Sequence, residues 1–295
     1  MKIGICRGMA RHIGDVDAQY ARLKDLGFDT TDESLCETDS PYYASREAME
    51  EHCKQVREAS EKYGIEVFQV HASYGVWYKK ENWNESYAGI LDILRLGLYG
   101  AHLMGAKNYV LHPLSECGVW CERTYFNSDE TYEHTIRCAK DLLPDCEKYR
   151  IVLCLENLAD KNRKICDPIV LAKAVAEIDS PYLGICLDTG HAAIVGVEIG
   201  DAVRACGKYL RCLHTHDNNG AEDQHNLPYY GTINWDSFTD ALAEINYDGS
   251  ISLEAGVYRS KYLTPALREK MDDVCMTIIR HLARETERKK AELIR

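Results

Sequence analysis

Short apolar runs alternate with longer amphipathic segments along the chain, and this alternation limits the possible folds more than any other feature. Eight runs have the length and apolar content of strands: residues 2–6, 28–32, 65–71, 107–112, 151–156, 182–188, 209–214 and 249–254. Apolar residues at helical spacing follow them, as in residues 84–105. Alternating strands and helices favour a parallel sheet. Eight such units favour a closed (β/α)8 TIM barrel, expected here as a single domain over residues 1–295.

A doubly wound open sheet is the main alternative to the barrel. Such a sheet usually carries a glycine-rich phosphate-binding turn after its first strand, and Cys6-Arg7-Gly8-Met9 matches that turn poorly. No linker or low-complexity segment separates the repeating units. We therefore expect the barrel.

The composition is that of an acidic globular protein, expected to be cytoplasmic. The 47 acidic residues outnumber the 35 basic ones, and the net charge of −12 repels nucleic acid and anionic membranes unless a local patch opposes it. No apolar run approaches the roughly 20 residues of a membrane span, and no apolar leader follows Met1-Lys2. The 13 cysteines show no paired Cys-x-x-Cys spacing, and several lie in strand-like runs. They are expected to be small buried side chains in a reducing compartment.

Histidines and carboxylates recur where the predicted strands end. The clearest case is the buried run 182–188, which ends in Asp188 and opens into an expected loop with His191. Each such residue alone is more often a cap or a hydrogen-bonded loop residue. Together they form an ordered set: His71, His112, Glu156, Asp188, His191, His214, Asp223, His225 and Glu254.

The carboxyl ends of the strands of a TIM barrel share one face, so this set should converge in one basin. Imidazoles and carboxylates are the ligands that suit zinc, manganese, iron or magnesium. Clustered carboxylates would repel one another without a cation. The pattern therefore predicts a divalent metal site.

The motifs around these residues resemble the xylose isomerase-like barrel superfamily, which contains the sugar phosphate isomerase/epimerase family and endonuclease IV. The matching motifs cover nearly the whole chain: Val70-His71-Ala72, Leu111-His112-Pro113, Glu156-Asn157, Asp188-Thr189-Gly190-His191, His214 to Asp217, Asp223-x-His225 and Glu254.

The resemblance to the ketose 3-epimerases and related isomerases implies one divalent ion, Mn, Co, Mg or Zn. Its ligands would be Glu156, Asp188, His214 and Glu254, with His191 contacting the substrate. The ion would polarise a carbonyl and the adjacent hydroxyl of a sugar or sugar phosphate, which lowers the pKa of the C–H between them. Glu156 and Glu254 are the candidates to remove and return that proton through a metal-stabilised enediolate. Barrels of this family often form homodimers, so the resemblance leaves the oligomeric state open between a monomer and a homodimer.

The resemblance to endonuclease IV implies an alternative function. In that enzyme all nine positions bind up to three zinc ions, which adds His71, His112, His191, Asp223 and His225 to the metal ligands. A bridging Glu156 and a metal-bound hydroxide would suit hydrolysis of a phosphodiester at an abasic site.

Charge favours a sugar over DNA as the partner. The predicted loops offer few basic residues for a groove that must neutralise several phosphates: Arg7, Arg11, Lys79, Lys80 and Arg123. The segment Gly231-Thr232-Ile233-Asn234-Trp235 resembles the start of the seventh helix in sugar isomerases.

Two tryptophans follow the first two histidines and are candidates for substrate binding. Trp77 and Trp120 could cover the apolar face of a sugar, or they could pack in a lid. The arginine that clamps substrate in the 3-epimerases is absent after His214. The sugar, its phosphorylation and the stereocentre therefore stay open.

Overall fold

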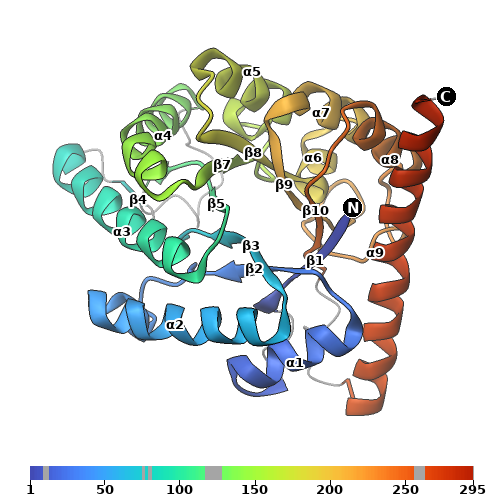
Figure 1. The fold of residues 1–295 in the computed structure, drawn as a ribbon. Helices are drawn as coiled ribbons and strands as arrows, with labels where there is room; N and C mark the ends of the chain where they lie inside the picture. The colour runs from blue at the N-terminus through green and yellow to red at the C-terminus, as the bar shows by residue number, and fades with distance from the viewer. Residues whose placement is uncertain (9–12, 75–76, 79–81, 117–127, 256–262, 295) are drawn as a thin grey trace.

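The computed structural model describes residues 1–8, 13–74, 77–78, 82–116, 128–255 and 263–294, and it confirms the TIM barrel. Eight parallel strands pair in the order β10-β1-β2-β3-β5-β7-β8-β9, surrounded by helices (Figure 1). They are β1 (Lys2–Cys6), β2 (Thr30–Ser34), β3 (Glu66–His71), β5 (Asn108–Leu111), β7 (Val152–Glu156), β8 (Leu183–Asp188), β9 (Leu210–His214) and β10 (Ser250–Leu253).

The barrel closes between β9 and β10. Thr215, directly after β9, forms a parallel bridge with Leu253. Its amide donates to the carbonyl of Ser252 at 2.8 Å, and its carbonyl accepts from the amide of Glu254 at 3.1 Å. Closure therefore occurs at the carboxyl ends of the strands and places the residues after β9 beside those after β10.

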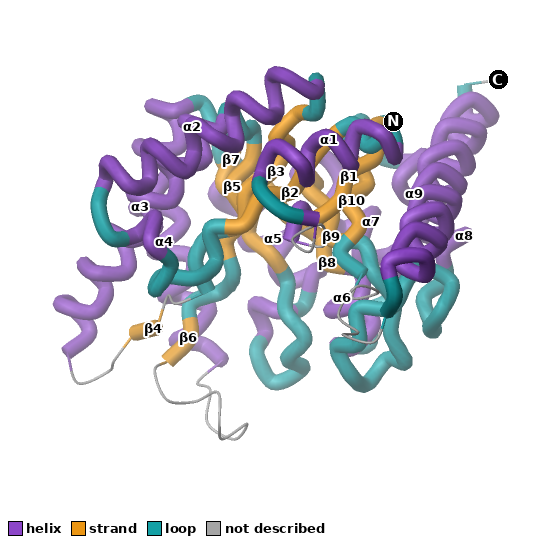
Figure 2. Tube along the Cα trace, turned by 90° about the horizontal axis from the view of Figure 1, so that it is seen from below, coloured by secondary structure: helices purple, strands orange, loops and turns teal. Residues whose placement is uncertain are grey.

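Helices cover the outside of the barrel, and the longer loops gather at one end of it (Figure 2). The helices are α1 (Val16–Leu26), α2 (Arg46–Tyr63), α3 (Trp83–Met104), α4 (Ser128–Tyr149), α5 (Pro168–Ile178), α6 (Thr189–Val195), α7 (Ile199–Cys206), α8 (Trp235–Glu244) and α9 (Pro265–Leu293). Short 3-10 turns are η2 (Pro41–Tyr43), η5 (Lys164–Cys166) and η6 (Gly207–Tyr209). A small separate sheet pairs β4 (Trp77–Tyr78) with β6 (Ser115–Glu116).

All eight predicted strands are present, with one clear shift of boundary. The second strand was expected at residues 28–32 and lies at Thr30–Ser34. Phe28 follows α1 and is part of the hydrogen bonding that ends this helix. Its amide donates to the carbonyl of Leu23, and Gly27 between them has a left-handed backbone conformation. This is the usual hydrogen-bond pattern of a glycine-ended helix.

One expectation about helices is wrong. Residues after Asp188 were expected to open into a loop, and they form α6, because the Asp188 carboxylate caps the His191 amide at 2.7 Å. A bend or an end was expected near Pro144, and the helix does not end there, since α4 continues to Tyr149. Leu142 and Cys146 on either side are fully buried, and this packing offsets the one hydrogen bond that proline removes.

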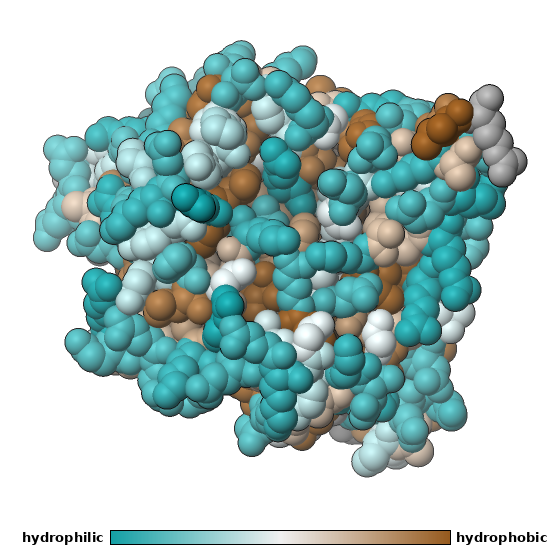
Figure 3. Space-filling model, viewed as in Figure 1, coloured by the Kyte–Doolittle hydropathy of each residue, from teal (hydrophilic) through white to brown (hydrophobic). Residues whose placement is uncertain are grey.

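Cysteines fill part of the barrel interior, as expected of small apolar side chains. Cys154, Cys186 and Cys212 pack with Phe68 and Val110 in one buried cluster. Every cysteine in the described ranges is free. A larger core lies between the strands and the helices, while polar residues cover most of the face shown in Figure 3. No helix among the described residues combines the length and apolarity needed to cross a membrane.

Candidate metal centre

All nine residues singled out in the sequence lie at the carboxyl end of the barrel. His71, Glu156, Asp188 and His214 end β3, β7, β8 and β9, and His112 and Glu254 directly follow β5 and β10. His191 lies in α6, while Asp223 and His225 lie in the loop between β9 and α8. Most of them line a cavity of about 790 Å³. The barrel therefore brings these residues together at one end, as the sequence predicted.

Asn157 locks the ends of β7 and β8 together. Its side-chain amide donates to the Asp188 carbonyl at 3.0 Å, and its side-chain oxygen accepts from the Asp188 amide at 2.8 Å. Its own carbonyl lies 2.9 Å from His191 Nδ1. The Glu-Asn motif thus sets the positions of Glu156, Asp188 and His191 relative to one another.

The residues between Asp188 and His191 join α6 to the end of β9. Thr189 Oγ1 donates to the His216 carbonyl at 2.6 Å and accepts from the His216 amide at 3.0 Å. A Cβ atom at Gly190 would overlap the His216 imidazole. Glycine is therefore required where α6 and His216 approach most closely.

Asp217 organises the loop that carries Asp223 and His225. Its fully buried carboxylate accepts four N–H bonds, from the amides of Asn218 (2.8 Å), Tyr229 (3.1 Å) and Ile233 (3.2 Å) and from the indole of Trp235 (2.8 Å). Asp217 and Asn226 also exchange two backbone bonds of 2.8 Å. The segment Gly231 to Trp235 therefore wraps a buried charge.

His225 is held in a strained backbone conformation, with φ of 49°. Left-handed backbone is uncommon for residues other than glycine and is often found at functional sites. The conformation aims the imidazole into the cavity, where Nδ1 lies 2.8 Å from the Glu254 carbonyl.

Ligand-type atoms converge in two groups around Glu156. His71 Nε2 and His112 Nε2 are 3.0 Å apart, and each lies 3.3 Å from Glu156 Oε2. On the other side, His214 Nδ1 lies 2.9 Å from Glu156 Oε1 and 3.3 Å from Glu254 Oε2. The Asp188 carboxylate lies within 4.8 Å of ligand atoms of Glu156 and His191, and in a further group within the same distance of those of His216 and Glu254.

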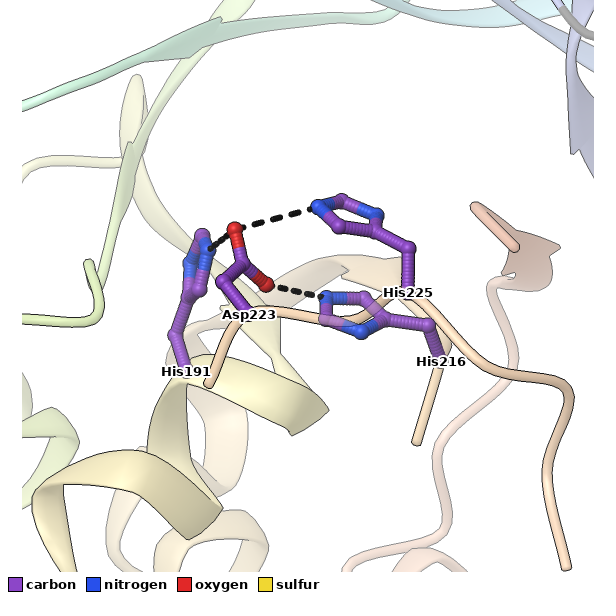
Figure 4. A group of neighbouring side chains, drawn as sticks. All are labelled: His191, His216, Asp223 and His225. Atoms are coloured by element: carbon purple, nitrogen blue, oxygen red, sulfur yellow. Dashed lines mark hydrogen bonds and ion pairs between the residues drawn. The ribbon is translucent and has the colours of Figure 1, made fainter. Parts of the chain in front are cut away.

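A third group forms around Asp223 (Figure 4). Asp223 Oδ2 lies 3.4 Å from His191 Nε2 and 3.2 Å from His225 Nε2. His216 lies beside them, with its ring stacked on His225 at 4.0 Å and its Nε2 2.9 Å from the Asp188 carboxylate.

These spacings fit divalent ions. Ligand atoms bound at 2.0–2.1 Å to a tetrahedral zinc ion lie about 3.3–3.4 Å from one another. His71, His191 and His225 each place Nδ1 at 2.8–2.9 Å from a backbone carbonyl. That oxygen can only accept, so Nδ1 carries a proton and Nε2 is the nitrogen available to bind a cation. Within the described residues, buried Glu156 Oε2 has no hydrogen-bond donor, so a cation would satisfy it.

The pKa values of the side chains in the metal-free protein also indicate a site suited to a cation. Burial raises the pKa of Glu156, but the imidazoles of His214 and His112 outweigh burial and bring it well below its usual range. Burial lowers the pKa of His191, yet Asp188 and Asp223 raise it overall to about 10. Burial lowers the pKa of His112 to about 4. Glu156 is thus ionised at neutral pH, and a proton on His191 partly takes the place of a cation.

Tyr74 is the aromatic residue that lines the cavity within the described part of the chain. Its ring stacks on His112 at 5.0 Å and meets His71 edge-on at 4.7 Å. Trp120 lies outside the described residues, as does the side chain of Trp77. The basic residues Arg11, Lys79, Lys80 and Arg123 also lie outside them.

Two residues near the centre were not singled out as site residues. His216 could have been found from the spacing of His214 and His216, because alternate residues of a strand share a face. Asp32 ends the strand expected at residues 28–32, and in the structure its carboxylate lies 2.8 Å from His214 Nε2.

Comparisons with known proteins agree with this architecture. Residues 20–273 match the family described as xylose isomerase-like TIM barrel. A D-psicose 3-epimerase of Ruminiclostridium cellulolyticum is 28% identical over 165 residues, which are 55% of this chain and 53% of that one. A probable endonuclease 4 of Mesomycoplasma hyopneumoniae is 27% identical over 136 residues, 43% of this chain and 46% of that one. The crystal structure of a D-tagatose 3-epimerase-like protein has a TM-score of 0.73 over 100% of both chains, at 23% identity.

Replacing Asp217 should destabilise the fold strongly. Asp217→Ala leaves four N–H groups without their acceptor, two of them in fully buried bonds, and we expect the free energy of unfolding to fall by about 2–6 kcal/mol. Urea unfolding of the metal-free protein measures this. Glu222→Ala in the same loop is the control, since its exposed side chain should contribute less than about 0.5 kcal/mol. Equal stabilities of the two variants would contradict the role given to Asp217.

The metal-free protein should lose stability as the pH rises. The pKa of His191 is about 10 in the folded chain and about 6.5 when unfolded. The folded state therefore binds the proton more tightly, and this stability is present below pH 6.5 and is lost as the pH rises toward 10. Urea unfolding in the presence of a chelator across this range should show the loss. The loss should be smaller in His191→Gln and unchanged in the exposed control His281→Gln.

Proposed function

Because the chain belongs to the xylose isomerase-like TIM barrel family, we propose that it is a divalent-metal-dependent isomerase or epimerase of a sugar or sugar phosphate. The proposal rests on the pair Glu156 and Glu254, whose carboxylates approach His214 Nδ1 from two strands at 2.9 and 3.3 Å. Both glutamates line the cavity.

Glu156, Asp188, His214 and Glu254 would hold the ion, for which Mn, Co, Mg and Zn are the candidates. When bound, such an ion polarises a carbonyl and makes the neighbouring C–H more acidic.

The two glutamates would carry out the proton transfer. The low pKa of Glu156 keeps it ionised. Glu254 has a side-chain exposure of 21%, against 2% for Glu156, so it is the carboxylate more open to a substrate in the cavity. One carboxylate would remove the proton next to the carbonyl and the other would return it. His191 would contact the substrate from α6.

The charge of the cavity supports a small polyhydroxyl substrate. Among the described residues that line it, the acidic ones outnumber the basic ones: Glu156, Asp160, Glu222, Asp223 and Glu254 against Lys161 and Arg163. Arg163 is itself paired with Asp160 at 2.9 Å. Such a wall attracts cations and hydroxyl groups more than a polyphosphate chain. The relative that acts on D-psicose supports the same class of substrate.

A second candidate is a multi-zinc phosphodiester hydrolase of the endonuclease IV type. The observation in its favour is that all nine positions are present and that, together with Cys186 and His216, they form five overlapping groups of ligand-type atoms within 4.8 Å of one another. The match to a probable endonuclease 4 spans a smaller share of the chain than the match to the epimerase.

Turnover of a ketose should depend on the two glutamates. The protein loaded with Mn²⁺ or Co²⁺ is expected to epimerise a member of a ketose panel that includes D-psicose, as measured by chromatography of the products. Glu254→Gln and Glu156→Gln should lower kcat by about 10²–10⁴-fold, the usual contribution of a general acid or base. Glu61→Gln, on the exposed face of α2, should leave kcat unchanged.

The same samples distinguish the second candidate. About one equivalent of metal per chain with ketose turnover supports the isomerase. Two to three equivalents of zinc, with cleavage of an abasic duplex and no ketose turnover, would replace it with the hydrolase.

A further inference from the structure

Asp32 is a buried carboxylate inside the barrel that takes no part in the three groups described above. It lies at 2% exposure in β2, where its backbone pairs with Cys6 of β1 and Gln69 of β3. Its Oδ2 lies 2.8 Å from His214 Nε2 and accepts from Gln69 Nε2 at 3.1 Å. A charge so deep in a barrel is costly unless it has a specific partner.

His214 is oriented differently from the other histidines of the centre. His71, His191 and His225 turn Nδ1 toward a backbone carbonyl and Nε2 toward the cavity. His214 does the reverse, with Nε2 toward Asp32 and Nδ1 toward Glu156 and Glu254. Its partner is also a carboxylate and not a backbone carbonyl.

The packing around His214 leaves its ring little freedom. The side chain is 1% exposed, and the ring stacks on that of His71 at 5.7 Å with an interplanar angle of 10°. Gln69, which is fully buried, holds the Asp32 oxygen and also lies 3.5 Å from the Leu213 carbonyl. The imidazole therefore lies between Asp32 on one side and the two glutamates on the other.

We propose that Asp32 is a positioning residue that fixes His214 with its proton on Nε2, so that His214 binds a divalent cation through Nδ1. This inference rests on the metal site of the proposed function. Asp32 and the glutamates face opposite nitrogens of one ring, so Asp32 acts on the cation through His214. A carboxylate that accepts the N–H of a ligand histidine orients the ring and makes the other nitrogen a stronger ligand.

Zinc affinity tests the proposal without any substrate. The metal-free protein and its Asp32→Asn and Asp32→Ala variants are titrated with Zn²⁺ in competition with a chromophoric chelator. Loss of an outer-shell partner typically weakens metal binding 10–100-fold. We expect this loss at the site that contains His214, with a larger effect for Asp32→Ala because Asn can still accept the Nε2–H bond.

Glu33→Gln is the matched control. Glu33 is the next residue of β2, equally buried, and it faces the helices, where it contacts Arg7 at 2.5 Å and Tyr20 at 2.8 Å. Losing this charge should lower stability without changing zinc affinity. If Asp32→Ala bound zinc as tightly as the wild type at every site, the proposal would be overturned.

A spectroscopic signature separates positioning from general stabilisation. In the zinc-loaded wild type, long-range ¹H–¹⁵N correlation should show His214 bound through Nδ1 and protonated at Nε2. His191 and His225 should be protonated at Nδ1, which faces a backbone carbonyl in both, and they serve as internal references. Binding of His214 through Nε2 would overturn the proposal whatever the enzyme does to ketoses. The expected pattern without ketose turnover would instead reject the isomerase and leave the role of Asp32 intact.

Discussion

Closure of the barrel between β9 and β10 is the constraint on which the candidate centre depends. The bridge from Thr215 to Leu253 joins strands whose ends carry His214 and Glu254. Without that closure the sheet would be open, and these two side chains would stand at opposite edges of it. The parallel direction of all eight strands adds Glu156 and Asp188 to the same face.

The centre concentrates charge that the fold itself does not need. Glu156, Asp188 and Asp32 are each at most 2% exposed, and they meet buried imidazoles instead of lysines or arginines. Buried carboxylates are tolerated only with compensating partners. In the metal-free chain protons on histidines supply part of that compensation, as the raised pKa values of His191 and His225 indicate. Divalent cations would supply it more completely, because they also bring the lone pairs of Glu156 Oε2 and its neighbours to a common point.

The loops position residues of the candidate centre, as the strands do. Asp223 and His225 do not lie on a strand. The loop that carries them is held by the buried Asp217, whose carboxylate accepts four N–H bonds. The Gly231 to Trp235 segment, which resembles sugar isomerases in sequence, contributes two of those four donors. Its physical role is therefore to hold the loop that carries Asp223 and His225.

The amino-acid sequence alone determined the barrel and the nine residues that converge at its carboxyl end, although it missed His216 and Asp32. Strand and helix periodicities are local, and the rule that strand ends share one face converts the positions of His71, Glu156 or Glu254 into a prediction of contact. Local hydrogen bonds were harder to foresee: the cap at Asp188 turned an expected loop into α6. Only the tertiary structure decided which nitrogen of each histidine faces the cavity. That choice depends on partners such as Asp32, which lies 182 residues from His214 in sequence and meets it only because the barrel interior brings β2 and β9 together.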